Sequence, residues 1–258
     1  MLRPRTFDAV QLSRVAPTAE LTGLVDIFWS VAWDLPAGEE RTQETLPYPA
    51  VHLVVEDGTA RIYGVATERF TRRLSGCDWV LGVKFHPGGF RPYLGSSVSG
   101  VRGRVIEATE ALPDVPALVD AVLAAADFAS RSEAATGWLL DHLPAPDPVV
   151  AEAIRAVSLI AENPAIVRVE ELAERLGRSV RGVQRLFTDY VGVSPKWVVR
   201  RFRMHEAAQR AAEGLVDWAA LAADLGYYDQ PHFVRDFTAT VGVPPARYAE
   251  ECADDVSS

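Results

Sequence analysis

The sequence predicts an α+β protein of two domains: an N-terminal antiparallel β barrel or sandwich followed by helices, and a C-terminal all-α tandem helix-turn-helix. Over the first ~105 residues, apolar and polar side chains alternate with the period of two that half-buried strands show. From about residue 113 the apolar positions follow the helical period instead. Between Leu172 and Tyr248 one helical pattern occurs twice. We expect domains at 1–143 and 149–251, with 144–148 as a linker.

The N-terminal strands are predicted from three apolar faces, in residues 27–35, 51–55 and 79–85. Turn signals such as Asp57-Gly58 and Pro87-Gly88-Gly89 separate them, and a short helix over 18–25 is expected before the first strand. Four polar side chains on the opposite pleat are expected to face solvent: His52, Glu56, Lys84 and His86.

Two helices are expected between about residues 113 and 143. The apolar stripe of the first contains Leu118, Val122 and Ala126. This stripe should lie in a homodimer interface or else pack on the N-terminal strands. The proline-rich linker follows, and a helix over 149–161 opens the C-terminal domain.

The repeated pattern is a short helix, a glycine turn and a second helix, the arrangement of a helix-turn-helix. Leu-Ala-Glu-Arg-Leu-Gly at 172–177 returns as Leu-Ala-Ala-Asp-Leu-Gly at 221–226, and Val-Gly-Val-x-Pro closes each unit at 191–195 and 241–245. Ser179 and Asp229 should begin the second helices, over 180–191 and 230–241. Ser194-Pro195 should begin a connecting helix of roughly 28 Å. Two recognition helices on its ends can reach major-groove segments roughly 34 Å apart.

The distribution of charge supports binding of double-stranded DNA by the first unit. Net charge is −9, yet residues 168–205 carry nine basic and four acidic side chains. Residues 206–258 carry three basic and ten acidic side chains, and residues 1–167 have a net charge of −7. The basic segment therefore coincides with the first repeat, as the electrostatic footprint of a DNA-binding unit does.

The sequence does not indicate a disulfide framework, a metal site or a catalytic site. The two cysteines, Cys77 and Cys252, favour neither a disulfide framework nor a metal centre, and a reduced, cytoplasmic setting is expected. Neither a signal peptide nor a membrane span is recognisable. His52 and Glu56, four residues apart on a strand, are about 13 Å apart and make a poor metal pair. We expect no catalytic residues, no cofactor and no metal.

Four further motifs lie in the repeat at fixed spacing: Gln184-Arg185-Leu186-Phe187, Gly192-x-Ser194-Pro195, Gly226-Tyr227-x-Asp229-Gln230-x-His232-Phe233-x-Arg235-x-Phe237 and Gly242-x-Pro244-Pro245-x-x-Tyr248. Over about residues 150–250 they closely resemble the AraC/XylS family of bacterial transcription regulators. The first ~110 residues, with Trp33-Asp-Leu-Pro-Ala-Gly38 and Gly82-Val-Lys-Phe-His-Pro-Gly-Gly89, resemble a domain found beside such DNA-binding domains.

The resemblance implies promoter binding by the C-terminal domain, and effector sensing or dimerisation by the N-terminal one. It places Arg181, Gln184 and Arg185 at base edges in the first unit. In the second unit it places Gln230, His232 and Arg235 there. Arginine pairs with guanine and glutamine with adenine through two hydrogen bonds each.

Contacts to the DNA backbone are expected from Ser179, Thr188, Lys196 and Arg200. Three acids of the second unit, Asp224, Asp229 and Asp236, should repel phosphate. Asp229 has an alternative role as a helix cap, whereas no structural role is evident for Asp236.

The regulatory part of the prediction concerns the N-terminal aromatic residues. Trp29, Trp33, Trp79 and Phe85 can line a pocket for a small organic effector, or simply form core. The predicted partners are therefore double-stranded DNA, a small organic effector and a second copy of the chain, with contact to RNA polymerase left open. The alternative is an enzyme or DNA-modification protein with a DNA-targeting helix-turn-helix.

Overall fold

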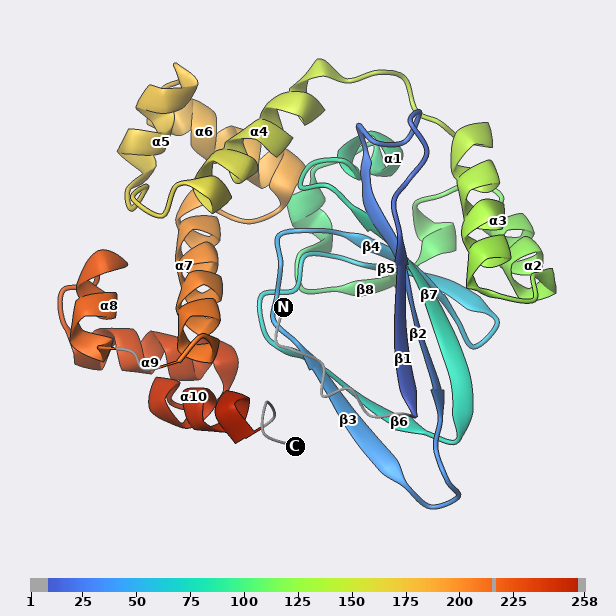
Figure 1. Ribbon diagram of the computed structural model, residues 1–258. Helices are drawn as coiled ribbons and strands as arrows, with labels where there is room; N and C mark the ends of the chain where they lie inside the picture. Colours follow the sequence, from blue (N-terminus) through green and yellow to red (C-terminus); the bar gives the residue numbers. More distant parts are fainter. Residues whose placement is uncertain (1–8, 215–216, 255–258) are drawn as a thin grey trace.

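The computed structural model describes residues 9–214 and 217–254, which begin with an antiparallel β region (Figure 1). Its main sheet has the strand order β1-β2-β7-β4-β5-β8, and β3 pairs with β6 in a separate two-stranded ribbon. The strands of the main sheet are β1 (Val10–Val15), β2 (Val25–Asp34), β7 (Cys77–Phe85), β4 (His52–Glu56), β5 (Thr59–Tyr63) and β8 (Val105–Glu107). The ribbon consists of β3 (Glu40–Thr45) and β6 (Phe70–Ser75). The predicted sandwich is confirmed, whereas the sheet is not closed into a barrel, since β1 and β8 lie at its two edges.

The register of β2 and β7 decides which side chains share a face, because directly opposed residues point the same way. Ala32 is opposite Trp79 and Phe28 is opposite Val83, whereas Trp29 is opposite Gly82. A Cβ at position 82 would lie 2.1 Å from the Trp29 ring, so only glycine fits there. Trp29 and Trp79 therefore point to opposite faces of the sheet.

The expectation that Glu56 faces solvent is wrong, because this carboxylate is only 4% exposed. The Tyr63 hydroxyl donates to it at 2.5 Å, Arg61 lies 3.5 Å away, and Arg72 of β6 forms a direct ion pair with it. Burial alone would raise the pKa of Glu56, but hydrogen bonds from Tyr63 and Arg72 lower it. The β3–β6 ribbon covers this face, which the alternation along β4 could not show. The expected helix over 18–25 is also wrong, since residues 19–24 form turns.

Several short helices complete the N-terminal part: α1 (Arg91–Leu94), the 3₁₀ turns η1 (Val98–Val101) and η2 (Ala108–Glu110), α2 (Val115–Ala124) and α3 (Phe128–Asp141). Helices α2 and α3 lie side by side next to the sheet (Figure 1). Leu118 and Val122 of the apolar stripe are 1% and 0% exposed in the core beneath α2, and Ala126 is exposed. The stripe thus packs within the chain, which was the second of the two alternatives.

The C-terminal part contains the two expected helix-turn-helix units. Helix α4 (Pro148–Glu162) precedes α5 (Val169–Leu176) and α6 (Val180–Leu186), which continues as the π-helical turn η3 (Phe187–Val191). The connecting helix is α7 (Pro195–Ala212), and α8 (Trp218–Asp224), α9 (Gln230–Val241) and α10 (Pro245–Asp254) form the second unit. Among the described helices, none has the length and apolar character that a membrane span requires.

The two units belong to different hydrophobic cores. One core joins the N-terminal sheet, α2 and α3 to α4 and the first unit. Gly192, at the end of the first recognition helix, has φ +85°, and a Cβ there would meet Val98 of η1 at 2.8 Å. The second unit packs on the C-terminal half of α7 in its own core, which also takes in Leu46. The first unit is therefore fixed against the N-terminal part by a continuous core.

Candidate nucleic-acid interface

The first recognition helix, α6 with η3, presents one polar face. Arg181, Gln184, Arg185 and Thr188 are all exposed, at the i, i+3, i+4, i+7 spacing of a single helix face. The residues between them, Val183, Leu186 and Phe187, are at most 4% exposed and anchor the helix in the core. This division agrees with the sequence prediction, and the contacts of these side chains with DNA remain a prediction.

Local hydrogen bonds set where the recognition helix begins and where the connecting helix follows. Ser179 Oγ accepts from the Gly182 amide at 3.1 Å, and Ser194 Oγ accepts from the Trp197 amide at 3.2 Å. Gly177 takes the left-handed conformation that ends α5, with φ +63°. Ser179 therefore caps its helix as expected, and its exposed hydroxyl hydrogen is still available to a phosphate oxygen.

Not all basic side chains of the first unit are available to DNA. Arg175 pairs with Glu171 at 2.8 Å, and Arg178 pairs with Glu152. No carboxylate of the described chain lies within 4 Å of the charged groups of Arg181, Arg185 and Lys196. All three are exposed, so they can approach phosphates or bases.

The second recognition helix, α9, is capped by Asp229, whose Oδ1 accepts from the His232 amide at 2.7 Å. Gln230, His232 and Arg235 are exposed. The His232 ring packs edge-on against Tyr227, with centroids 5.2 Å apart. The side chains predicted to touch DNA are thus accessible in this unit as well.

Asp236 has the structural role that the sequence did not reveal. Its carboxylate is 13% exposed, forms an ion pair with Arg200 of α7, and accepts from the Tyr227 hydroxyl at 3.1 Å. Burial and then the neighbouring Asp236 carboxylate raise the pKa of Tyr227, so this hydroxyl stays a donor. Arg200 therefore holds α9 against the connecting helix, and its contact with phosphate stays a prediction. The expectation that Asp236 is a free repulsive charge is wrong.

The N-terminal part also holds the second unit. Leu46, which is 4% exposed, lies in the core of that unit. Arg69 donates to the carbonyl of Val241, near the end of α9, at 3.1 Å. His205 Nε2 donates to the Pro47 carbonyl at 3.2 Å, and Arg201 to the Thr67 carbonyl at 3.3 Å. Sequence analysis missed these contacts because nothing local connects residues 46–69 with a helix at 230–241.

The proposed effector residues are not brought together. Trp29 and Trp33 lie with the cluster under the β3–β6 ribbon, whereas Trp79 and Phe85 face the main core. Trp33 is 6% exposed and Phe85 is fully buried. Arg131 of α3 lies over the Trp79 ring, 3.6 Å from its centroid. The expectation of one pocket lined by all four is therefore corrected.

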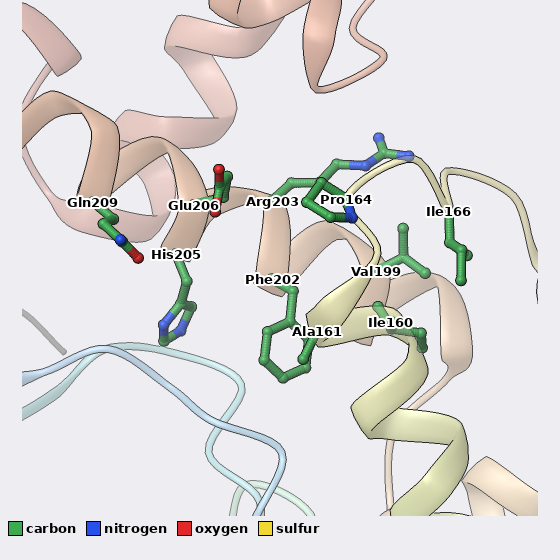
Figure 2. Close-up of a pocket in the computed structure, with 10 residues that line it drawn as sticks. All are labelled: Ile160, Ala161, Pro164, Ile166, Val199, Phe202, Arg203, His205, Glu206 and Gln209. Atoms are coloured by element: carbon green, nitrogen blue, oxygen red, sulfur yellow. The ribbon is translucent and has the colours of Figure 1, made fainter.

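A cavity of about 170 Å³ lies instead between the end of α4 and the connecting helix α7. Figure 2 shows Ile160, Ile166, Val199 and Phe202 at its apolar side, with His205 pointing toward the N-terminal loop that holds Pro47. Ligand sites for drug-sized molecules usually measure about 300–1,000 Å³. This cavity is too small for such a ligand as it stands.

Two family models match separate parts of the chain. Residues 13–107 match a domain described as "Domain of unknown function (DUF6597)". Residues 172–251 match a domain described as "Helix-turn-helix domain". The second match covers both helix-turn-helix units, from α5 into α10.

The chain is similar to solved structures of several bacterial proteins. A transcriptional regulator with an AraC-type DNA-binding domain from Chromobacterium violaceum is 24% identical, over 38% of this chain and 88% of that one, with a TM-score of 0.36. The C-terminal domain of AraT from Geobacillus stearothermophilus is 25% identical, over 41% and 86%, with a TM-score of 0.36. ToxT from Vibrio cholerae with a bound unsaturated fatty acid is 11% identical, over 93% and 94%, with a TM-score of 0.41.

Proposed function

From the AraC-type helix-turn-helix domain that the C-terminal part of this chain forms, we propose a regulator of transcription that reads two successive major-groove segments of double-stranded DNA. The first recognition helix supplies most of the sequence readout. Arg181, Gln184 and Arg185 meet base edges, while Thr188, Ser179 and Lys196 contact the backbone. Gln230, His232 and Arg235 make the contacts of the second unit.

One observation supports this proposal above the others. The exposed face of α6 carries two arginines and a glutamine without carboxylate partners among the described residues, while the opposite face is buried in the core. Guanidinium and amide groups match the hydrogen-bonding edges of guanine and adenine in the major groove. A rigid helix that presents such groups outward is suited to read bases.

The spacing of the two units predicts the form of the DNA site. The connecting helix has 18 residues, a length of about 27 Å at 1.5 Å per residue. Recognition helices at its ends fit two readable segments about 10 base pairs apart, centre to centre. Selection of duplexes from a random pool by the full chain should enrich such a two-part sequence. If the pool stays random after repeated selection, the proposed function is wrong.

The N-terminal part regulates DNA binding by the second unit. Through Leu46, Arg69 and the Thr67 carbonyl, this part can fix or release the second unit, so a small organic effector or a second copy of the chain that shifts residues 46–69 would change DNA affinity. RNA polymerase is a further partner in this proposal. Thermal shifts with a compound library test for an effector. A compound that raises Tm and changes DNA affinity supports sensing, and Tm shifts without any change in affinity argue against it.

A further inference from the structure

The N-terminal part contains a segment whose charge differs from its surroundings. Residues 1–167 have a net charge of −7, yet residues 79–106 contain no acidic side chain and four basic ones. Within this segment, residues 95–104 read Gly-Ser-Ser-Val-Ser-Gly-Val-Arg-Gly-Arg. We call residues 95–104 the basic loop. An acid-free, hydroxyl-rich and arginine-rich stretch in an acidic domain is the composition of a surface that contacts phosphate.

The basic loop lies directly against the first recognition helix. Ser97 Oγ donates to the Thr188 carbonyl at 3.1 Å, and Val98 packs where a Cβ on Gly192 would be. Thr188 is the last of the four exposed residues on the polar face of that helix. The loop thus continues the predicted DNA-binding surface from the C-terminal end of the helix.

The other end of the basic loop points toward the middle of the connecting helix. The Gly103 amide donates to the Val65 carbonyl at 2.9 Å, and two residues later the Thr67 carbonyl accepts from Arg201 of α7. DNA that occupies both recognition helices must pass along α7, with its backbone between the two groove segments. The basic loop is joined, through residues 65–67, to the helix along which that DNA must run.

The side chains of the basic loop are free to act on phosphate. Ser96, Arg102 and Arg104 are exposed, and no carboxylate of the described chain lies within 4 Å of either guanidinium. Arg104 Nη1 donates to the Gly100 carbonyl at 3.1 Å, which holds this side chain near the loop without neutralising its charge. We propose that the basic loop, through Arg102 and Arg104, contacts the phosphates of double-stranded DNA flanking the first recognition helix. This inference rests on the proposed function and adds the N-terminal part to the DNA interface.

The test measures the salt dependence of DNA binding by the full chain. The probe is a 30-base-pair duplex, of the order of three helical turns, that the wild-type chain has selected from a random pool. Each phosphate contact contributes about 0.9 to the slope of log affinity against log salt. The double variant Arg102→Gln, Arg104→Gln should reduce the slope by about 1.8. Its loss of affinity should then be roughly 12-fold larger at 50 mM than at 200 mM salt.

Three further variants make the result decisive. Arg73→Gln removes an exposed arginine of β6, whose side chain is 74% accessible and pairs with Glu40, and should leave the slope unchanged. Ser96→Lys should increase the slope by up to about 0.9, and it tests the proposal even if the double variant does not fold. Arg185→Ala should lower affinity for the selected duplex. An unchanged slope in both basic-loop variants, with Arg185→Ala still impaired, overturns this inference alone. Wild-type protein that binds no duplex overturns the proposed function and the inference together.

Discussion

The guanidinium of Arg200 on the connecting helix and the carboxylate of Asp236 on the second recognition helix form an ion pair, and Tyr227 donates to the same carboxylate at 3.1 Å. This contact fixes the angle of α9 on α7, so a residue that repels phosphate in isolation serves to position the second unit. The net charge of −7 on residues 206–258 therefore says little about how tightly the second unit binds DNA.

Asp236→Asn should lower DNA affinity, because it removes the charge that pairs with Arg200. The Arg200 side chain is about half exposed, so losing the ion pair should lower the free energy of unfolding by about 1 kcal/mol. That value is at the upper end of what surface ion pairs contribute. Asp224→Asn is the matched control, since it removes the same charge from a 65% exposed carboxylate. Duplex binding by both variants at low salt checks the prediction. A gain in affinity for Asp236→Asn alone would show that repulsion outweighs positioning.

Leu118→Ala should destabilise the chain by about 2–5 kcal/mol, because the side chain is 1% exposed beneath α2 and leaves a cavity in the main core. Leu123→Ala, at a position that is 48% exposed on the same helix, should change stability by no more than about 0.5 kcal/mol. Urea denaturation measures both. Equal effects would indicate that α2 is not packed as described.

Arg69→Ala should loosen the end of the second recognition helix, because its bond to the Val241 carbonyl is lost. Amide hydrogen exchange in residues 238–243 should become faster, while exchange in α6 stays the same. Arg73→Ala, four residues later on β6, is the control. Unchanged protection in the Arg69 variant would mean that the N-terminal part does not restrain this unit.

Stability should fall as the pH drops below about 6.5, because two histidines are held neutral. Burial, with help from Lys84, lowers the pKa of His52 to about 3, and burial lowers the pKa of His205 to about 4. Unfolded histidine titrates near 6.5, so between that pH and the folded values the unfolded chain binds more protons. Their contribution is present above pH 6.5 and decreases by at most about 1.4 kcal/mol per pH unit for each histidine.

Denaturant titrations at pH 7 and pH 5 measure this effect. His205→Gln keeps a donor for the Pro47 carbonyl without a titrating ring, and it should reduce the pH dependence. The unfolding free energy of the wild-type chain should be lower at pH 5. If it is the same at both values, the histidines are not buried in neutral form.

Local signals in the sequence predicted the helices of the C-terminal part well. Ser179, Ser194 and Asp229 each cap the helix that follows them, as their position before a run of helical residues indicates. Relations between distant residues could not be predicted in this way. Asp236 pairs with a residue 36 positions earlier, and Leu46 enters a core formed by helices beyond residue 200. Such contacts depend on the packing of whole elements, which periodicity does not encode.

The claim that α6 reads bases is tested most directly by comparing Arg185→Ala with Lys196→Ala on the selected duplex and on a random duplex. Arg185 lies on the exposed recognition face, and Lys196 lies at the start of the connecting helix, where a phosphate contact is expected. We predict that Arg185→Ala costs about 1–3 kcal/mol on the selected duplex and much less on random DNA. Lys196→Ala should weaken both duplexes equally and reduce the salt slope by about 0.9. Equal losses on both duplexes for Arg185→Ala would contradict base readout by this helix.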